Sequence, residues 1–264
     1  MIFINHDDLR SLELMELCLQ KGYYVTDRVQ DIKYADIIYL GVKGIDRKNR
    51  LFMNDETIVL SNDIFDNLKE DCTLITLIKN TYLEELSIEK NFHYIVLQKQ
   101  DDFIVKNSIL TAEGLLSYII SHRRFPIYES NIMVLGFGNS GKPIVQYLKA
   151  LGAKVYVVTK NKNDIEEISK LECIYRDIQN IKLNDIDILI NTIPSVFVDE
   201  QDLNSASSDL MIIDIASYPY GINHHYALSK GINSIILPSI PCKYAYGYAG
   251  QLIFYFIERV IGNE

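Results

Sequence analysis

The residues with the clearest chemical meaning are three glycines, Gly136, Gly138 and Gly141, which form a G-x-G-x-x-G pattern. An apolar run precedes them and the helix-like "KPIVQYLKALG" follows. In this spacing the first glycine permits a tight turn, the second lets backbone approach a pyrophosphate, and the third allows close packing of helix on strand. The following helix N-terminus offers free N–H groups to phosphate. We therefore predict a dinucleotide-binding loop at Gly136, Phe137, Gly138, Asn139, Ser140 and Gly141.

The residues after the next apolar run bear on which dinucleotide binds. An NAD-preferring site usually has Asp or Glu at the end of this strand, where it holds the ribose 2′-OH. Here the strand ends in "VVTKNKND", so Lys160 and Lys162 are available to a 2′-phosphate. We expect NADP, with Thr159 and Lys160 in the cofactor site. Asp164 keeps NAD open, and a solvated loop that only caps the next helix is the alternative for the lysines.

Two later apolar runs end in polar residues, in "ILINTIPS" (188–195) and "IIDIASYP" (212–219). The carboxyl ends of parallel strands form the edge at which open α/β sheets bind ligands. Turn chemistry alone would also explain these residues. We assign to cofactor contact Asn191, Thr192, Pro194 and Ser217.

Composition limits the function classes. The 264 residues exceed an ordinary domain of ~100 to 150 residues, which favours two domains. Apolar residues make up 48% and charged residues 23%, as in globular proteins. A net charge of −9 argues against nucleic acid and anionic membrane surfaces as partners.

Neither targeting nor metal signals are found in the sequence. No run of 18 apolar residues and no basic start before an apolar stretch is present, so we expect no membrane helix, no secretory signal and a cytoplasmic protein. The four cysteines form no CxxC pair, which predicts reduced thiols and no metal site.

The apolar runs predict the fold class. Strand-like runs alternate with helix-period stretches, first over "MIFIN", "DIIYL", "TIVL", "TLITL" and "HYIVL". The alternation resumes from residue 131 over "IMVLGF", "KVYVVT", "DIDILINT", "LMIIDIA" and "INSIILP". Such alternation implies parallel strands with crossover helices. We predict an α/β protein with a flavodoxin-like N-terminal domain and a C-terminal Rossmann-type, doubly wound parallel sheet.

These patterns divide the chain into four parts. A helix expected over Ser108–His122 precedes a break at "RRFPIYESN", and an apolar helix closes the chain. We place an N-terminal α/β substrate or partner domain at 1–110, the linking helix and break at 111–129, the NAD(P)-binding domain at 130–245, and a closing helix that could pack back on the N-terminal domain at 246–264.

Several stretches together resemble a known family, the A subunits of dipicolinate synthase. The stretches that carry the resemblance are "QDDFIVKNSILTAEG" (100–114), "SNIMVLGFGNSG" (130–141), "DIDILINTIPS" (185–195), "IIDIASYPYG" (212–221) and "AGQLI" (249–253). The likeness in order and spacing covers about residues 95 to 255, whereas the first ninety residues agree only in their α/β pattern.

The resemblance implies an oxidoreductase that converts a dihydrodipicolinate-type intermediate into dipicolinate during endospore formation. It also implies an NAD(P) cofactor, a small dicarboxylate substrate, a flavoprotein-like B subunit of dipicolinate synthase as partner, and the cytoplasm of a sporulating mother cell. A homo-oligomer is left open. Removal of hydride and a proton yields an aromatic ring, so the protein mainly positions donor and nicotinamide.

The sequence departs from the family's pattern mainly around the expected substrate pocket. Leu110 replaces a proline, and the turn expected as Arg-Pro-Gly-Gly reads Tyr218-Pro219-Tyr220-Gly221. Later Pro-Gly and Ala-Pro pairs become Pro241-Cys242 and Ala245-Tyr246. A non-catalytic, NAD(P)-sensing regulatory protein is therefore an alternative function.

The candidate catalytic residues are Asn107, Glu113 and Lys243. Asn107 or Lys243 would bind a substrate carboxylate and Glu113 would take a proton. The alternative is that Ser108 and Thr111 cap the helix and that Glu113 lies in its first turn.

Two further groups have competing interpretations. His224 and His225 are expected at the surface or at a helix cap rather than in catalysis, and Tyr244, Tyr246 and Tyr248 would line one face of an extended segment or pack with the closing helix. A 2-hydroxyacid dehydrogenase is a further alternative, but it needs a late His, and none follows His225.

Overall fold

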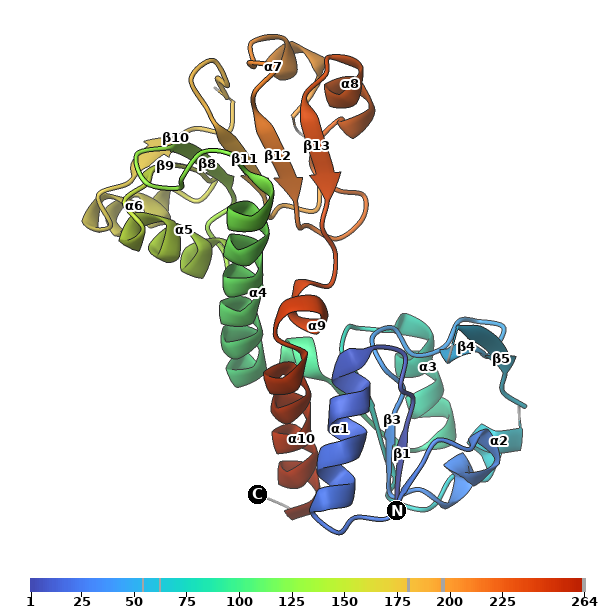
Figure 1. The fold of residues 1–264 in the computed structure, drawn as a ribbon. Helices are drawn as coiled ribbons and strands as arrows, with labels where there is room; N and C mark the ends of the chain where they lie inside the picture. The colour runs from blue at the N-terminus through green and yellow to red at the C-terminus, as the bar shows by residue number, and fades with distance from the viewer. Residues whose placement is uncertain (54, 62, 180, 196–197, 263–264) are drawn as a thin grey trace. The chain divides into compact units, whose positions relative to one another are not determined.

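The computed structural model describes residues 1–53, 55–61, 63–179, 181–195 and 198–262. The chain forms two compact units (Figure 1). Unit 1 comprises Met1–Asn107 and Pro241–Glu264, and unit 2 comprises Ser108–Ile240. Each unit has its own parallel sheet and its own buried core.

Unit 1 contains a five-stranded parallel sheet in the order β2-β1-β3-β6-β7. This is the flavodoxin-like order, and its direction reverses between β1 and β3. In register, Ile4 at the end of β1 lies beside Tyr39 at the end of β3. The strands are β1 (Ile2–Ile4), β2 (Val25–Thr26), β3 (Ile37–Tyr39), β6 (Thr73–Thr76) and β7 (His93–Val96).

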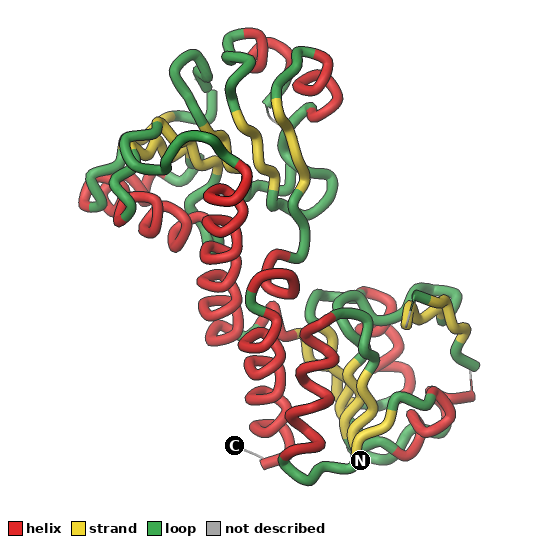
Figure 2. Tube along the Cα trace, viewed as in Figure 1, coloured by secondary structure: helices red, strands yellow, loops and turns green. Residues whose placement is uncertain are grey.

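Helices cover both faces of this sheet. The helix α1 (Leu9–Gln20) lies beside the closing helix α10 (Tyr246–Gly262) (Figure 1 and Figure 2), and Leu14 of α1 shares a buried cluster with Ile253 of α10. The other helices of the unit are α2 (Asp63–Asp66), α3 (Thr81–Lys90) and short 3₁₀ segments at Val29–Tyr34 and Leu97–Lys99.

The prediction of parallel pairing is wrong at one strand of unit 1. The run "TIVL" falls in β5 (Glu56–Val59), which pairs antiparallel with β4 (Arg50–Met53) outside the main sheet. Only positions 54 and 55 separate these strands. So short a connection can join antiparallel strands only, because a parallel pair needs a crossover of a dozen residues or more.

Unit 2 contains a six-stranded parallel sheet in the order β10-β9-β8-β11-β12-β13, the Rossmann order. Its strands are β8 (Asn131–Leu135), β9 (Lys154–Val158), β10 (Ile174–Arg176), β11 (Ile188–Asn191), β12 (Met211–Asp214) and β13 (Asn233–Ile236). Its shorter helices are α5 (Gly141–Ala150), α6 (Ile165–Lys170), α7 (Glu200–Asn204) and α8 (His224–Ser229), with a 3₁₀ turn at Lys162–Asp164. The predicted fold class is confirmed. Sequence analysis missed β10, an edge strand with no fully buried residue.

The long helix α4 (Asp101–His122) begins seven positions earlier than predicted. Asp101 and Asp102 occupy its first turn, where acids favour the helix dipole. Ser108, Thr111 and Glu113 therefore lie inside the helix, and the interpretation of these residues as cap and first-turn chemistry is wrong.

Within the described residues, α4 is also the one helix long and apolar enough to cross a membrane by length and composition alone. Its residues Ala112, Leu115 and Ile119 are fully buried in the core of unit 2. Other apolar residues of the helix, Val105 and Ile120, are exposed. Length and composition alone are weak evidence for a membrane span, because a core helix of a globular protein satisfies the same criterion.

The segment before the closing helix is helical as well. Tyr244 ends α9 (Ile240–Tyr244), and α10 begins at Tyr246. The prediction that Tyr244, Tyr246 and Tyr248 line one face of an extended segment is wrong, because residues two apart on a helix point in different directions. The last two residues of the predicted closing helix, 263 and 264, lie outside the described residues.

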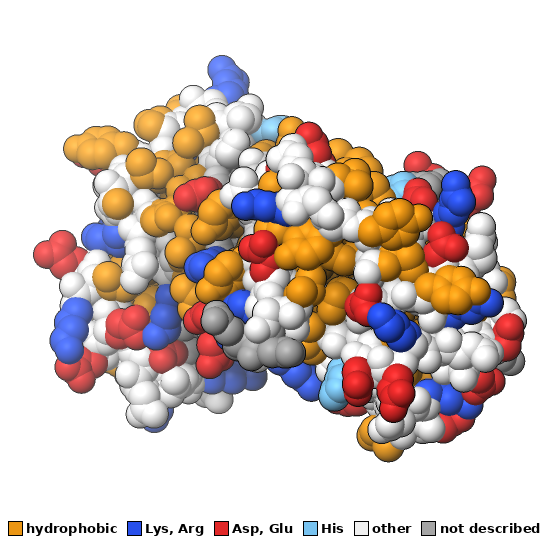
Figure 3. Space-filling model, turned by 90° about the horizontal axis from the view of Figure 1, so that it is seen from below, with side chains coloured by type: hydrophobic (Ala, Val, Ile, Leu, Met, Phe, Trp, Pro, Cys, Tyr) orange, Lys and Arg blue, Asp and Glu red, His pale blue; other side chains and the backbone are white. Residues whose placement is uncertain are grey.

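Charges of both signs are mixed on the face of the molecule that Figure 3 shows. Lys and Arg side chains alternate there with Asp and Glu side chains, and no single sign dominates.

Candidate functional site

The glycine-rich loop joins β8 to α5, and its three glycines differ in how closely other atoms approach them. A Cβ on Gly136, whose φ is +98°, would lie 2.3 Å from Thr192 Oγ1. A Cβ on Gly141 would lie 2.2 Å from the carbonyl oxygen of Gly136. A Cβ on Gly138 would meet nothing within 4 Å. The first and third glycines thus permit close packing, while the backbone at Gly138 faces open space into which a phosphate could come.

The N-terminus of α5 follows this loop directly. Ser140, its N-cap residue, makes no side-chain cap hydrogen bond, so its hydroxyl does not compete for the first-turn N–H groups. These groups and the helix dipole favour an anion at this point. Lys142 Nζ lies 2.5 Å from Glu167 Oε2 and 5.2 Å from the Phe137 ring centroid, so its charge is already partnered.

The end of β9 is the second part of the candidate cofactor site. Thr159 is buried, and its hydroxyl donates to Asp164 Oδ2 at 3.0 Å. Asn161 Nδ2 donates to the other carboxylate oxygen of Asp164 at 2.9 Å. Lys160 and Lys162 are exposed. Asp164 is therefore held in the turn by two donors, while both lysine ammonium groups lie at the surface.

The ends of β11 and β12 meet in a buried hydrogen-bond network around Asp214. The Asp214 carboxylate is fully buried and accepts from Asn191 Nδ2 at 2.8 Å, Ala216 N at 3.0 Å and Gly221 N at 2.9 Å. It also lies 3.3 Å from His224 Nε2. The network fastens the loop after β12 to the end of β11, because one carboxylate binds groups from both.

Asn191 ends β11, as predicted, and its side chain is fully buried in this network. Its amide lies inward, with Nδ2 also donating to Ile193 O at 3.0 Å and Oδ1 accepting from Ile193 N at 3.0 Å. A Cβ on Gly221 would lie 2.4 Å from Asn191 Nδ2. The Asn191 side chain shapes the loop, whereas Thr192, Pro194 and Ser217 lie partly or fully exposed around it.

Sequence analysis missed the roles of Asp214 and His224. The expectation that His224 is a surface or capping residue is wrong, because its ring is half-buried between Asp214 and Ser234, with Nδ1 2.7 Å from Ser234 Oγ. Asn223 caps the helix instead, accepting from Tyr226 N at 3.0 Å. An acid as the last residue of a fully apolar strand was the signal available in the sequence.

The three predicted catalytic residues are divided between the units. Asn107, half-buried, and Lys243, exposed, belong to unit 1, whereas Glu113, exposed, belongs to unit 2. Asn107 and Glu113 are six positions apart on α4, about 120° around the helix, so they occupy different faces. The helix alone therefore does not bring Asn107 and Glu113 to one place.

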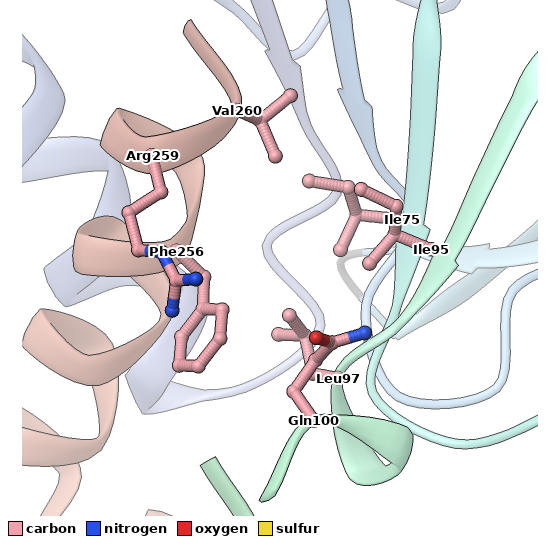
Figure 4. Close-up of a pocket in the computed structure, with 7 residues that line it drawn as sticks. All are labelled: Ile75, Ile95, Leu97, Gln100, Phe256, Arg259 and Val260. Carbon is pink, nitrogen blue, oxygen red and sulfur yellow. The ribbon is translucent and has the colours of Figure 1, made fainter. Parts of the chain in front are cut away.

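A cavity of about 140 Å³ lies in unit 1 between α10 and the strands β6 and β7 (Figure 4). Its walls are mainly apolar, with Gln100 and Arg259 as the polar residues, and they comprise Ile75, Ile95, Leu97, Gln100, Phe256, Arg259 and Val260. It contains none of the predicted site residues.

Comparisons with known proteins add the family. No family model matches the chain. The A subunit of dipicolinate synthase from Bacillus subtilis is 32% identical over 215 residues, covering 81% of this chain and 72% of that protein. The chain belongs to the family of dipicolinate synthase A subunits. The resemblance seen in the sequence is thereby confirmed.

Solved structures agree with the family and extend the fold likeness. The crystal structure of the dipicolinate synthase A subunit from Bacillus halodurans has a TM-score of 0.86 at 28% identity, covering 98% of this chain and 96% of that chain. A D-isomer specific 2-hydroxyacid dehydrogenase from Lactobacillus delbrueckii ssp. bulgaricus, solved in an NAD complexed form, has a TM-score of 0.60 at 12% identity, covering 99% and 97%. The latter likeness concerns the fold alone.

Proposed function

We propose that the chain is the NADP-linked oxidoreductase component of a dipicolinate synthase. It would dehydrogenate a dihydrodipicolinate-type intermediate to dipicolinate. Membership of the dipicolinate synthase family supports the reaction class. The observation that carries the proposal is the glycine loop, in which Gly136 and Gly141 are packed tightly and Gly138 faces open space at the helix N-terminus.

The residues present fit a dinucleotide. The backbone at Gly138 and the first turn of α5 would hold the pyrophosphate, and the end of β9 would hold the adenosine ribose. When bound, the nicotinamide accepts a hydride from the substrate. The buried network around Asp214 fixes the loop after β12, so this side of the site needs little rearrangement when a ligand binds.

The preference for NADP rests on charge at the end of β9. Lys160 and Lys162 are exposed cations, and a 2′-phosphate gains charge-assisted hydrogen bonds from such groups. The Asp164 carboxylate is already satisfied by Thr159 and Asn161, which leaves it less available to a ribose hydroxyl. We therefore place NADP ahead of NAD.

The remaining parts of the proposal come from the family resemblance. The partner would be the flavoprotein-like B subunit, the substrate a small cyclic dicarboxylate, and the place of action the cytoplasm of a sporulating mother cell. Of the departures from the family's pattern, Leu110 and Cys242 are buried and Tyr246 is exposed.

The experiment is a turnover assay with the purified chain, alone and with the flavoprotein-like partner. Freshly generated dihydrodipicolinate is supplied, and both reduced nicotinamide and dipicolinate are measured, with NADP and NAD compared. We expect equal amounts of dipicolinate and NADPH. Binding of NADP without any turnover, even with the partner present, would contradict the proposal and favour the sensing role.

A further inference from the structure

The face of the unit 1 sheet that packs on α10 is incompletely covered at one edge. A row of side chains crosses this face in register from β1 to β7, formed by Ile4, Tyr39, Ile75 and Ile95. The row belongs to the apolar cluster that includes residues of α10. Its first three members are fully buried, whereas Ile95, on the edge strand β7, is only half-buried. The cover over the row therefore ends short of β7.

The cavity of about 140 Å³ lies at this place, and we refer to it as the edge cavity. Ile75 and Ile95 line it from the sheet, and Phe256 and Val260 line it from α10 (Figure 4). In another protein, an apolar cavity of about 150 Å³ stays dry and binds benzene. The edge cavity thus has the volume and the walls to take one small ring or a branched chain of similar size.

A cation lies at the rim of the edge cavity. Arg259 Cζ is 5.4 Å from the ring centroid of Phe256 and 6.0 Å from that of Tyr255. Residues three and four apart on a helix are neighbours, so these two rings support the guanidinium beside the cavity. Its Nη1 lies 3.6 Å from Asp102 Oδ2, in a pair of exposed side chains that stabilises little. Arg259 therefore has N–H donors to offer to an anion.

Gln100 faces Arg259 and Phe256 from the other side of the edge cavity (Figure 4). Its backbone is fixed, because its N–H donates to Leu97 O at 2.9 Å and its C=O accepts from Ile104 N at 2.9 Å. Its side-chain amide adds two N–H donors. The lining residues of the described chain include no acid. An arginine and an amide at the rim of an apolar cavity suit a carboxylate, which only accepts hydrogen bonds.

We propose that the edge cavity binds a small monocarboxylate with a compact apolar body, of which benzoate is the simplest aromatic example. The apolar body occupies the space between Ile95 and Val260, and the carboxylate binds the Arg259 guanidinium and the Gln100 amide. A second carboxylate on the same body would lie among apolar side chains without a partner, so dicarboxylates are excluded. All these residues belong to unit 1, and the proposal does not depend on the function proposed above.

The test titrates benzoate into the full chain, followed by calorimetry and by NMR of the methyl groups of Ile75, Ile95, Leu97 and Val260. We expect a dissociation constant on the order of 0.1 mM, which is reasonable for a ligand of about nine non-hydrogen atoms. The four residues should show the largest methyl shifts. Benzyl alcohol, which has the ring without the charge, should bind about tenfold more weakly, and dipicolinate should leave these methyl signals unchanged.

Substitutions separate the carboxylate partner from the apolar space. Arg259→Gln should weaken benzoate about tenfold or more and leave benzyl alcohol unchanged, whereas Asp102→Asn should strengthen benzoate about two- to fivefold by removing a competing acid. Ile95→Phe should fill the cavity and abolish binding of both ligands. The matched control is Arg176→Gln, which removes an exposed guanidinium that lies 5.2 Å from the Tyr156 ring centroid in unit 2. Thermal unfolding checks that each variant is folded.

Three results would overturn the proposal. The first is the absence of methyl shifts at Ile75 and Ile95 with benzoate. The second is equal benzoate affinity in the wild type and in a folded Arg259→Gln variant. The third is self-association of the chain that Ile95→Phe abolishes, without benzoate binding, because the cavity would then be an interface between two copies.

Discussion

In each of the two sheets the strand order reverses at a switch point, yet the carboxyl edges of the two sheets are chemically different. In unit 2 the edge consists of backbone and satisfied side chains, since the buried Asp214 is bound by four neighbours. In unit 1 the edge contains Asp7, whose carboxylate packs on Gly41 and whose pKa is raised by burial. The first edge is suited to hold an anionic group rigidly, whereas the second presents a partly buried acid.

This difference shows how one architecture can give two chemically different edges. Backbone N–H groups at a helix N-terminus bind phosphate without any side chain, so the glycines of unit 2 need only keep the space clear. At the end of β1, in contrast, the sheet edge presents a titratable carboxyl whose charge is disfavoured by burial. The comparison can be tested from either side.

The largest expected effect on cofactor binding concerns Gly138. Replacement by Val should reduce NADP affinity at least about a hundredfold, because the side chain would fill the open space beside the pyrophosphate. The fold should persist, since a Cβ there meets nothing within 4 Å. Calorimetry measures the affinity, with Gly247→Val, a similarly uncrowded position in unit 1, as the control. Unchanged NADP affinity in a folded Gly138→Val variant would contradict the assignment of the pyrophosphate site to Gly138.

A large effect on stability is expected at the Asp8–Arg10 pair. Burial alone would raise the pKa of Asp8, but hydrogen bonds and charge from Arg10 outweigh it and lower the pKa. Asp8→Asn keeps the N-cap of α1 and deprives the buried Arg10 of its hydrogen-bonded counter-charge, which should cost about 3 to 5 kcal/mol. Chemical denaturation measures this free energy of unfolding.

The pH dependence of the same pair has a defined sign. Because the pKa of Asp8 is lower in the folded state, its stabilisation is present above the unfolded-state pKa and is lost as the pH falls through the folded-state pKa. Asp8→Asn should therefore flatten the acid limb of stability. The control Asp46→Asn, in an exposed pair with Arg50, should change stability little. If Asp8→Asn and Asp46→Asn lowered the free energy of unfolding equally, burial of the Asp8–Arg10 pair would not explain its contribution.

A smaller effect is expected at the end of β9. Lys160→Glu should weaken NADP by ~1.5 to 3 kcal/mol and NAD much less, because only NADP loses a partner for its 2′-phosphate and meets a repulsion. Dissociation constants for both cofactors measure the difference, and Lys182→Glu, also exposed in unit 2, controls for net charge. Equal weakening of both cofactors would show that Lys160 does not contact the phosphate.

The smallest expected effects concern the substrate contacts assigned to Asn107 and Lys243. Either alanine variant should keep NADP affinity and lower kcat/KM about ten- to a hundredfold, as loss of one carboxylate contact does. Steady-state kinetics on the dihydropyridine dicarboxylate measures it. Two folded variants with wild-type kinetics would place the substrate elsewhere.

The fold was predictable where local pattern and topology agree. Buried strands such as β8 and β11 are short apolar runs, and the glycine spacing lies directly between β8 and α5. The strands β4 and β10 escaped prediction, because neither has a run of buried residues, and the antiparallel pairing of the predicted strand β5 was missed as well. The start of α4 was misplaced, although Asp101 and Asp102 are acids that suit a first helical turn.

The site was less predictable because its key groups are distant in sequence. Asn191 and Asp214 come together only because β11 and β12 are neighbours in register. The Asp7 carboxylate packs on Gly41 and accepts a hydrogen bond from Val42 N, and both of these residues follow another strand. No spacing rule marks such contacts, since they arise from strand order.

Hydrogen exchange with and without NADP tests the central claim most directly, because it locates the bound dinucleotide without any substitution. The account predicts slower exchange of backbone amides at 137–143 and 159–163, with the carboxyl edge of unit 1 around Asp7 unchanged. No protection anywhere, or protection confined to unit 1, would contradict it.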